Sequence, residues 1–206
     1  MTLSAREAHA RKVAPKVDGV LPVFHERWSP RSFAEKEVSR ETLKKIFEAV
    51  RWTASAHNEQ PWRFLVGLRG TETWEKIYAS LMESHQKWAA KAPVLILAVA
   101  ANKFEHGDRP NRFAFYDLGS AVAHLTLQAS ALGLGTHQMA GYDTEKARGL
   151  LAIPEDYVMG AAIALGYQDE PEKLDDPAMI ERETMTRERK HLAEFVFGSW
   201  GEGMGI

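Results

Sequence analysis

The sequence FAFYDLGSAVAHLTLQASAL, residues 113–132, sets the architecture of this chain. Apolar or small side chains occupy nearly the whole circumference of a helix drawn through it, among them Leu118, Val122 and Leu125. A helix with so little polar surface is buried centrally, either inside one subunit or between two. Gly133 and Gly135 follow, and they predict that the helix ends there in a turn.

Helix and strand patterns alternate on both sides of this central helix. Apolar residues at every second position predict a half-buried strand over residues 62–68, and continuous apolar runs predict strands with both faces covered over residues 94–100 and 158–165. Apolar spacing of three and four residues predicts helices over residues 39–51 and 71–83. This order predicts a layered α/β or α+β fold with helices packed against a mixed sheet.

Composition narrows the class of protein. The chain has 206 residues, of which 45% are hydrophobic and 26% charged, so we expect one domain over residues 1–206 with a polar C-terminal extension. The chain has no cysteine, which excludes disulfides, thiolate zinc sites, cysteine-bound iron–sulfur clusters and a thiol nucleophile. Any redox chemistry therefore needs another carrier.

Charge and hydropathy exclude further classes. A formal net charge of -2, with no dominant basic patch, argues against a nucleic-acid partner. The longest apolar run, residues 94–101, is far shorter than the roughly 20 residues of a membrane helix, so no membrane partner is expected. Since the absence of cysteine fits a reducing compartment, we expect a cytoplasmic protein.

The first candidate site is the sequence RWSPRSF, residues 27–33. Pro30 favours an extended conformation at Ser29, which would place Arg27, Ser29 and Arg31 on one side of the chain. Two guanidinium groups around one hydroxyl could bind a phosphate, with each charge-assisted hydrogen bond contributing about 1.5–3 kcal/mol. The alternative is a solvated basic turn.

The second candidate site is SAHNEQPW, residues 55–62. Pro61 favours an extended residue before it, which would place Asn58 and Gln60 on one side and His57 and Glu59 on the other. Carboxamides suit a ligand edge that alternates hydrogen-bond donors and acceptors. A helix-to-strand connection whose amides satisfy the loop backbone is the alternative.

Two later segments carry weaker signals. Residues 133–143, GLGTHQMAGYD, match no dinucleotide fingerprint, but Ala140 and Gly141 leave room for a planar ligand to approach the backbone. The cluster RERK, residues 187–190, would by itself indicate a solvated face. Beyond it, Phe195, Phe197 and Trp200 are expected to dock on another surface, such as a partner subunit.

Together and in this order, these segments resemble the nitroreductase family of flavin-dependent oxidoreductases. The resemblance spans about residues 27–200 and leaves residues 1–20 as an N-terminal extension. It rests on RWSPR (27–31), SAHNEQPW (55–62), ALGLG (131–135), AGYD (140–143) and RERK (187–190). It implies a three-layer α+β fold with a mixed, mainly antiparallel sheet, an intimate homodimer, and non-covalent FMN at the dimer interface.

The resemblance also implies where FMN would bind. The FMN phosphate and ribityl chain would contact Arg27, Ser29, Arg31 and Arg189, with Arg187 as a further candidate. Asn58 would meet the pyrimidine edge of the ring, and Ala140 and Gly141 would lie beside the ring. Trp28 and Ala140 depart from the residue types common in the family. The implied cofactor-binding residues are Arg27, Trp28, Ser29, Arg31, Asn58, Gln60, Ala140, Gly141, Arg187 and Arg189.

The resemblance implies an FMN-dependent enzyme that takes hydride from NAD(P)H and reduces a nitroaromatic, a quinone or a similar small acceptor by a ping-pong mechanism. Because the flavin carries the chemistry, no side chain is assigned as a catalytic acid or base, and no metal is expected. The alternatives are a flavin-binding or storage protein, a family variant performing reductive dehalogenation or flavin breakdown, and a structural protein that docks through its aromatic C-terminus.

Overall fold

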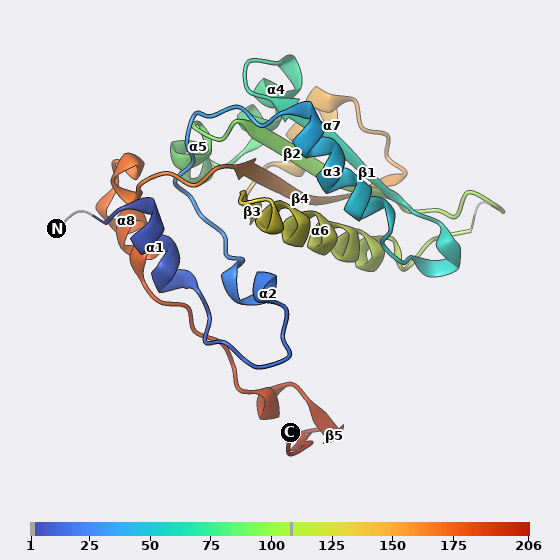
Figure 1. Ribbon diagram of the computed structural model, residues 1–206. Coiled ribbons are helices and arrows are strands. Elements are labelled where there is room, and N and C mark those ends of the chain that lie inside the picture. Colours follow the sequence, from blue (N-terminus) through green and yellow to red (C-terminus); the bar gives the residue numbers. More distant parts are fainter. Residues whose placement is uncertain (1–2, 108) are drawn as a thin grey trace.

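The computed structural model describes residues 3–107 and 109–206 and places helices on both faces of an antiparallel sheet (Figure 1). The spatial order of its strands is β1 (Trp62–Leu68), β2 (Val94–Ala101), β4 (Tyr157–Gly166) and β3 (Gly135–Met139). The predicted three-layer α+β fold is confirmed. All three strand pairs of this sheet run antiparallel, as the expectation of a mainly antiparallel sheet requires, and the described residues add no parallel pair to it.

The central strand β2 explains why three layers form. Its side chains alternate between two fully covered faces, with Ile96 and Ala98 in one core and Leu95 and Leu97 in the other. The first core is covered by α3 (Arg40–Arg51) and α6 (Ala114–Ala131), and the second by α4 (Glu72–Ser80), α5 (Glu83–Ala89) and α7 (Thr144–Leu151). The continuous apolar sequence of β2 therefore reflects burial of both of its faces, as predicted.

The central helix α6 has two different faces. Leu118, Val122 and Leu125 are buried against the sheet. Tyr116 is 74% exposed, and Ala123 is also exposed. The predicted central burial therefore holds for one face of α6 within a single chain, and the other face is uncovered.

Two boundaries differ from the sequence prediction. The predicted helix over residues 71–83 ends at Ser80, and α5 begins at Glu83. The turn predicted after Gly133 is short, because Gly135 already starts β3, which pairs with β4. Strand β3 forms because it pairs with β4, and this pairing cannot be predicted from its polar local sequence, Thr136-His137-Gln138.

The chain ends lie at one side of the molecule. Helix α1 (Ala5–Lys12) packs beside α8 (Pro177–Thr184), and α2 (Pro22–Glu26) follows it (Figure 1). The last residues form a small hairpin of β5 (Phe197–Ser199) and β6 (Glu202–Gly203), well away from the main sheet (Figure 1). Trp200 on this hairpin is 96% exposed, so its side chain does not dock on the described part of this chain.

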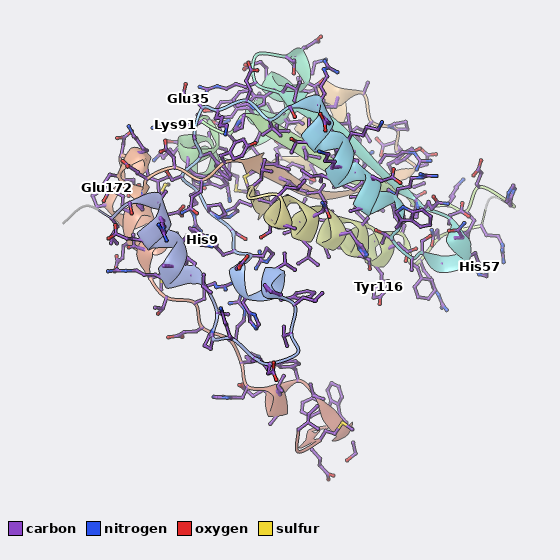
Figure 2. All side chains as sticks on the ribbon, in the orientation of Figure 1. His9, Glu35, His57, Lys91, Tyr116 and Glu172 are labelled. Atoms are coloured by element: carbon purple, nitrogen blue, oxygen red, sulfur yellow. The ribbon has the colours of Figure 1, made fainter. Side chains whose placement is uncertain are left out.

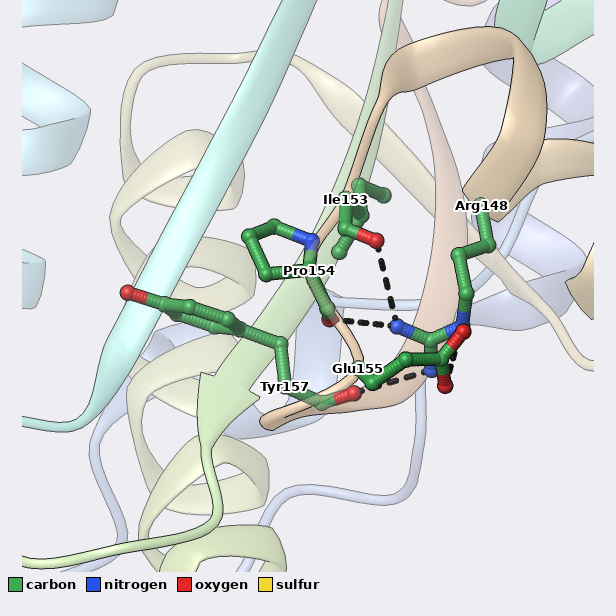
Figure 3. Close-up of polar contacts among 5 residues, drawn as sticks. All are labelled: Arg148, Ile153, Pro154, Glu155 and Tyr157. Carbon is green, nitrogen blue, oxygen red and sulfur yellow. Dashed lines mark hydrogen bonds and ion pairs between the residues drawn. The ribbon is translucent and has the colours of Figure 1, made fainter.

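Short segments complete the described chain. Three 3₁₀ turns span Ala56–Asn58, Pro171–Leu174 and Leu192–Glu194. Arg148 joins the end of α7 to the start of β4 by donating hydrogen bonds to the carbonyls of Ile153, Pro154 and Tyr157 (Figure 3). In residues 3–107 and 109–206, no helix is both long and apolar enough to cross a membrane.

Candidate functional site

Residues 25–32, which contain most of the predicted phosphate-binding sequence (residues 27–33) and are called the phosphate-binding candidate from here on, run past the C-terminal end of α6. A pocket of about 160 Å³ lies between the two and is lined by Trp28 and Pro30 on one side and by Ser130 and Gly135 on the other. A β-carbon at Gly135 would overlap the Pro30 ring, so glycine is required for this close approach. The start of β3 thereby fixes the position of the segment.

The backbone of this segment is held by side chains from distant parts of the chain. The carboxylate of Glu183 accepts hydrogen bonds from the amides of Arg31 and Ser32, at 2.9 to 3.1 Å. The guanidinium of Arg187 donates to the carbonyls of His25 and Arg27, both at 2.6 Å. These contacts leave the side chains of Arg27 and Ser29 outside the backbone network.

Three guanidinium groups gather at the segment. Arg27 donates to the hydroxyl of Ser29 at 3.4 Å, as its predicted position on the same side requires. Burial and the charge of Arg189 lower the pKa of Arg27, and burial and the charges of Arg27 and Arg189 lower that of Arg187. Among the described residues, no carboxylate forms an ion pair with any of the three. This local excess of positive charge suits an anion.

Two histidines lie between the phosphate-binding candidate and the Ala140–Gly141 turn, His137 beside Pro30 and His85 beside Gly141, and the charge of Arg31 acts on both. Burial and the charge of Arg31 lower the pKa of His85, and the same two causes lower the pKa of His137 to about 4. His137 lies against the carbonyl of Pro30, with its Nδ1 at 3.0 Å. The imidazole of His85 fills the position that a β-carbon at Gly141 would need. Ala140 itself is exposed at the end of β3.

The side chain of Trp28 points into the protein. It is 6% exposed, and its indole N–H donates to Nδ1 of His9 on α1 at 3.1 Å. The ammonium of Lys12, also on α1, lies 5.2 Å from the indole centroid. The N-terminal extension is therefore packed against the phosphate-binding candidate, and Trp28 serves that packing.

The SAHNEQPW segment does not take the extended conformation predicted from Pro61. His57, Asn58 and Gln60 have φ values of 55°, 57° and 50°. Proline disfavours the right-handed helical region at Gln60, and here the left-handed region is populated instead. The hydroxyl of Ser55 accepts from the amide of Gln60 at 2.9 Å and holds this turn. Left-handed residues other than glycine are strained and cluster at functional sites.

This segment lies at the opposite end of α6 from the cationic cluster. The amide of Ala56 donates to Asp117 in the first turn of α6, whereas Pro30 contacts the sequence after its last turn. The intervening helix spans about 20 Å at 1.5 Å per residue. Figure 2 shows the separation through His57 near one end and His9 near the other.

The structure thus brings one group of predicted residues together and separates the rest. Arg27, Ser29, Arg31, Arg187 and Arg189 lie around one segment, and Ala140 and Gly141 adjoin it through the two histidines. Asn58 and Gln60 lie at the other end of α6. Sequence reasoning missed Glu183, His137 and His85. A buried glutamate at 0% exposure in a polar C-terminal region carries no local signal, because its partners are 151 and 152 residues away.

Comparison with known proteins gives a consistent family. The model of the nitroreductase family matches residues 25–84 and 71–167. A protein of Archaeoglobus fulgidus with the provisional name NADH dehydrogenase/NAD(P)H nitroreductase is 30% identical over 174 residues, which cover 79% of this chain and 97% of that protein. The chain belongs to the nitroreductase family, as its motifs predicted.

Two solved structures extend the comparison. The crystal structure of an oxidoreductase containing FMN has a TM-score of 0.84 and 32% identity, covering 90% of this chain and 94% of that chain. A nitroreductase of Desulfovibrio desulfuricans, provisionally so named and in complex with FMN, has a TM-score of 0.69 and 26% identity, covering 89% of this chain and 98% of that chain.

Proposed function

We propose that this protein is an FMN-dependent oxidoreductase that uses NADH or NADPH to reduce a small acceptor such as a nitroaromatic or a quinone. The observation that carries the proposal is the uncompensated cluster of Arg27, Arg187 and Arg189 beside Ser29, in a member of the nitroreductase family. FMN contains a phosphate that such a cluster would hold. The FMN in two similar structures supports the same cofactor, and the name of the Archaeoglobus fulgidus relative supports the NAD(P)H donor.

The residues present fit FMN at both ends of the cofactor. Arg27, Ser29 and Arg189 would bind the phosphate through charge-assisted hydrogen bonds. At the ring end, the carbonyl of Gly141 accepts from Met82 and that of Ala140 from Tyr142, which fixes the turn beside which the planar ring would lie. When bound, FMN would supply hydride transfer in two half-reactions, first from NAD(P)H and then to the acceptor.

A homodimer would complete the site. A flavin held by Arg27 and Ser29 does not extend along α6 as far as Asn58 and Gln60 of the same chain. Two copies that pack their exposed α6 faces in opposite directions would bring Asn58 of the partner subunit near that flavin. The strained left-handed turn at Asn58 would then present its carboxamide to the pyrimidine edge, where donors and acceptors alternate.

The protein's own part in the reaction is binding, orientation and electrostatics. Arg31 would place positive charge near the ring end of the site, which favours negative charge that develops on a bound group. Burial keeps His137 neutral at neutral pH, so its Nδ1–H donates to Pro30 without adding charge. No protein side chain needs to act as an acid or base in this scheme.

The direct test is to purify the protein, record its visible spectrum, release any chromophore by denaturation and identify it chromatographically. We expect a yellow protein that releases FMN. A colourless protein that cannot be reconstituted with FMN would contradict the proposal. FMN-loaded protein that NAD(P)H does not reduce would instead indicate flavin storage, and products from a panel of oxidants would reveal dehalogenation or flavin breakdown.

A further inference from the structure

Two oppositely charged side chains hold the same short backbone segment. The Glu183 carboxylate accepts from the amides of Arg31 and Ser32, at the C-terminal end of the phosphate-binding candidate. The Arg187 guanidinium donates to the carbonyls of His25 and Arg27, at its N-terminal end. Because α8 carries the first and the chain just after α8 carries the second, this one region fixes both ends of the segment.

Glu183 has no exposed surface, and a buried carboxylate is costly unless its oxygens are hydrogen-bonded. Here both oxygens are satisfied by backbone amides. Burial raises the pKa of Glu183, while those amides and the charges of Arg31 and Lys12 lower it. By accepting both hydrogen bonds, the carboxylate fixes the orientation of the Arg31 and Ser32 amides. An apolar side chain of the same volume could not do this.

Arg187 is committed to the backbone of this segment through two of its five N–H donors. Both of its Nη atoms bind backbone carbonyls, and its Nε is buried without a partner in the structure. Arg189 differs, because only one Nη is bonded, to the carbonyl of Glu188, and the residue is exposed. The two arginines of the RERK cluster are therefore not equivalent.

We infer that Glu183 and Arg187 are positioning residues, which hold the backbone of residues 25–32 so that Arg27, Ser29 and Arg189 bind the FMN phosphate. The inference rests on the proposed function. It predicts selectivity for FMN over riboflavin, since riboflavin has the same ring and ribityl chain but lacks the phosphate.

The test is titration of the apoprotein with FMN and with riboflavin, followed by flavin fluorescence, in wild type and in Arg187→Lys and Glu183→Gln variants. Lysine keeps the charge of Arg187, but its single Nζ lacks the two separate Nη donors that reach the two carbonyls. Arg187→Lys should therefore weaken FMN binding about tenfold, while riboflavin affinity stays within about twofold. Glu183→Gln should give the same pattern, because its NH2 group cannot accept the hydrogen bond that Oε2 takes from the Arg31 amide, and the negative charge is lost.

A control accompanies these variants. Glu181→Gln removes an exposed charge from the same helix and should leave both affinities unchanged. Circular dichroism checks folding, and if Glu183→Gln does not fold, Arg187→Lys decides.

Three outcomes would overturn the inference. Full FMN affinity in Arg187→Lys would mean that its charge alone matters. Equal losses of FMN and riboflavin affinity would mean a merely structural role. Wild-type protein that binds neither flavin would overturn the proposed function and this inference with it. If wild type binds FMN and the ratio of FMN affinity to riboflavin affinity is unchanged in the variants, the inference alone is overturned.

Discussion

At the scale of the residue, His137 couples the candidate site to the stability of the fold. Its imidazole lies 4.6 Å from the Trp88 ring centroid, and its Nδ1 bonds to the carbonyl of Pro30. Burial, followed by the charge of Arg31, lowers the pKa of His137 to about 4. The residue that fixes the phosphate-binding segment is therefore neutral in the folded protein at pH 7.

We predict that acid removes stability through His137. In the unfolded chain its pKa is about 6.5. Between pH 6.5 and about pH 4 the unfolded state binds more protons than the folded state. The contribution of neutral His137 to the free energy of unfolding is therefore complete above pH 6.5 and is lost as pH falls toward 4. The free energy of unfolding should be about 2 kcal/mol lower at pH 5 than at pH 7 from this group alone. Urea denaturation at both pH values measures it, with His137→Gln as the variant that should lose this dependence. An identical pH dependence in the variant would contradict the assignment.

A second residue-scale prediction concerns the phosphate contacts. Replacing both Arg27 and Ser29 by alanine removes one guanidinium and the hydroxyl that it bonds, so FMN retention should fall at least tenfold. Equilibrium dialysis of the apoprotein with FMN measures the affinity. Unchanged affinity, with folding verified by circular dichroism, would show that the phosphate binds elsewhere.

How far the sequence reveals individual site residues depends on where their partners lie. Arg27, Ser29 and Arg31 are close in sequence, so local geometry was enough to group them. Glu183 and His137 reach the same segment from far along the chain, and single-sequence patterns contain no such distance. The left-handed turn at Asn58 was also hidden, because Pro61 excludes one conformation of Gln60 without selecting among the others.

At the scale of the element, the long and strongly patterned segments could be predicted. Strand β2 is buried on both faces, and helix α6 is buried along one full face. Burial of this kind leaves an apolar pattern in the sequence. The elements missed are short and polar: α5 has seven residues, and β3 is a five-residue strand at the edge of the sheet. Their tertiary neighbours, α4 and β4, stabilise them more than their own sequences do.

The buried face of α6 gives an element-scale prediction. Leu125 is fully buried in the core between α6 and the sheet, so Leu125→Ala should lower the free energy of unfolding by about 2–5 kcal/mol. Leu150→Ala on α7, at a residue 36% exposed, is the matched control and should cost much less. Equal losses in urea denaturation would contradict the assigned orientation of α6.

At the scale of the whole molecule, a single chain leaves apolar surfaces uncovered. They include the outer face of α6 near Tyr116 and the C-terminal hairpin with Trp200. Exposed apolar area of this kind marks interaction surfaces. Together with the separation of Asn58 from the arginine cluster, it supports the proposal that two copies form the active unit.

We predict that a charge on the outer face of α6 separates the copies. Ala123→Arg places a long cation on the exposed face, so the variant should sediment as a monomer with unchanged circular dichroism, whereas wild type should sediment at twice the chain mass. FMN retention should fall with the dimer. Ala178→Arg, on the exposed surface of α8, is the control and should remain dimeric. A dimeric Ala123→Arg variant would place the interface elsewhere.

The measurement that tests the central proposal most directly is anaerobic mixing of the FMN-loaded protein with NADH or NADPH, followed by the flavin absorbance. We predict rapid loss of the yellow colour with one of the two donors, and its return when a nitroaromatic or quinone is added after the donor is consumed. A bound flavin that keeps its colour with both donors would contradict the proposal that this protein is an NAD(P)H-dependent oxidoreductase.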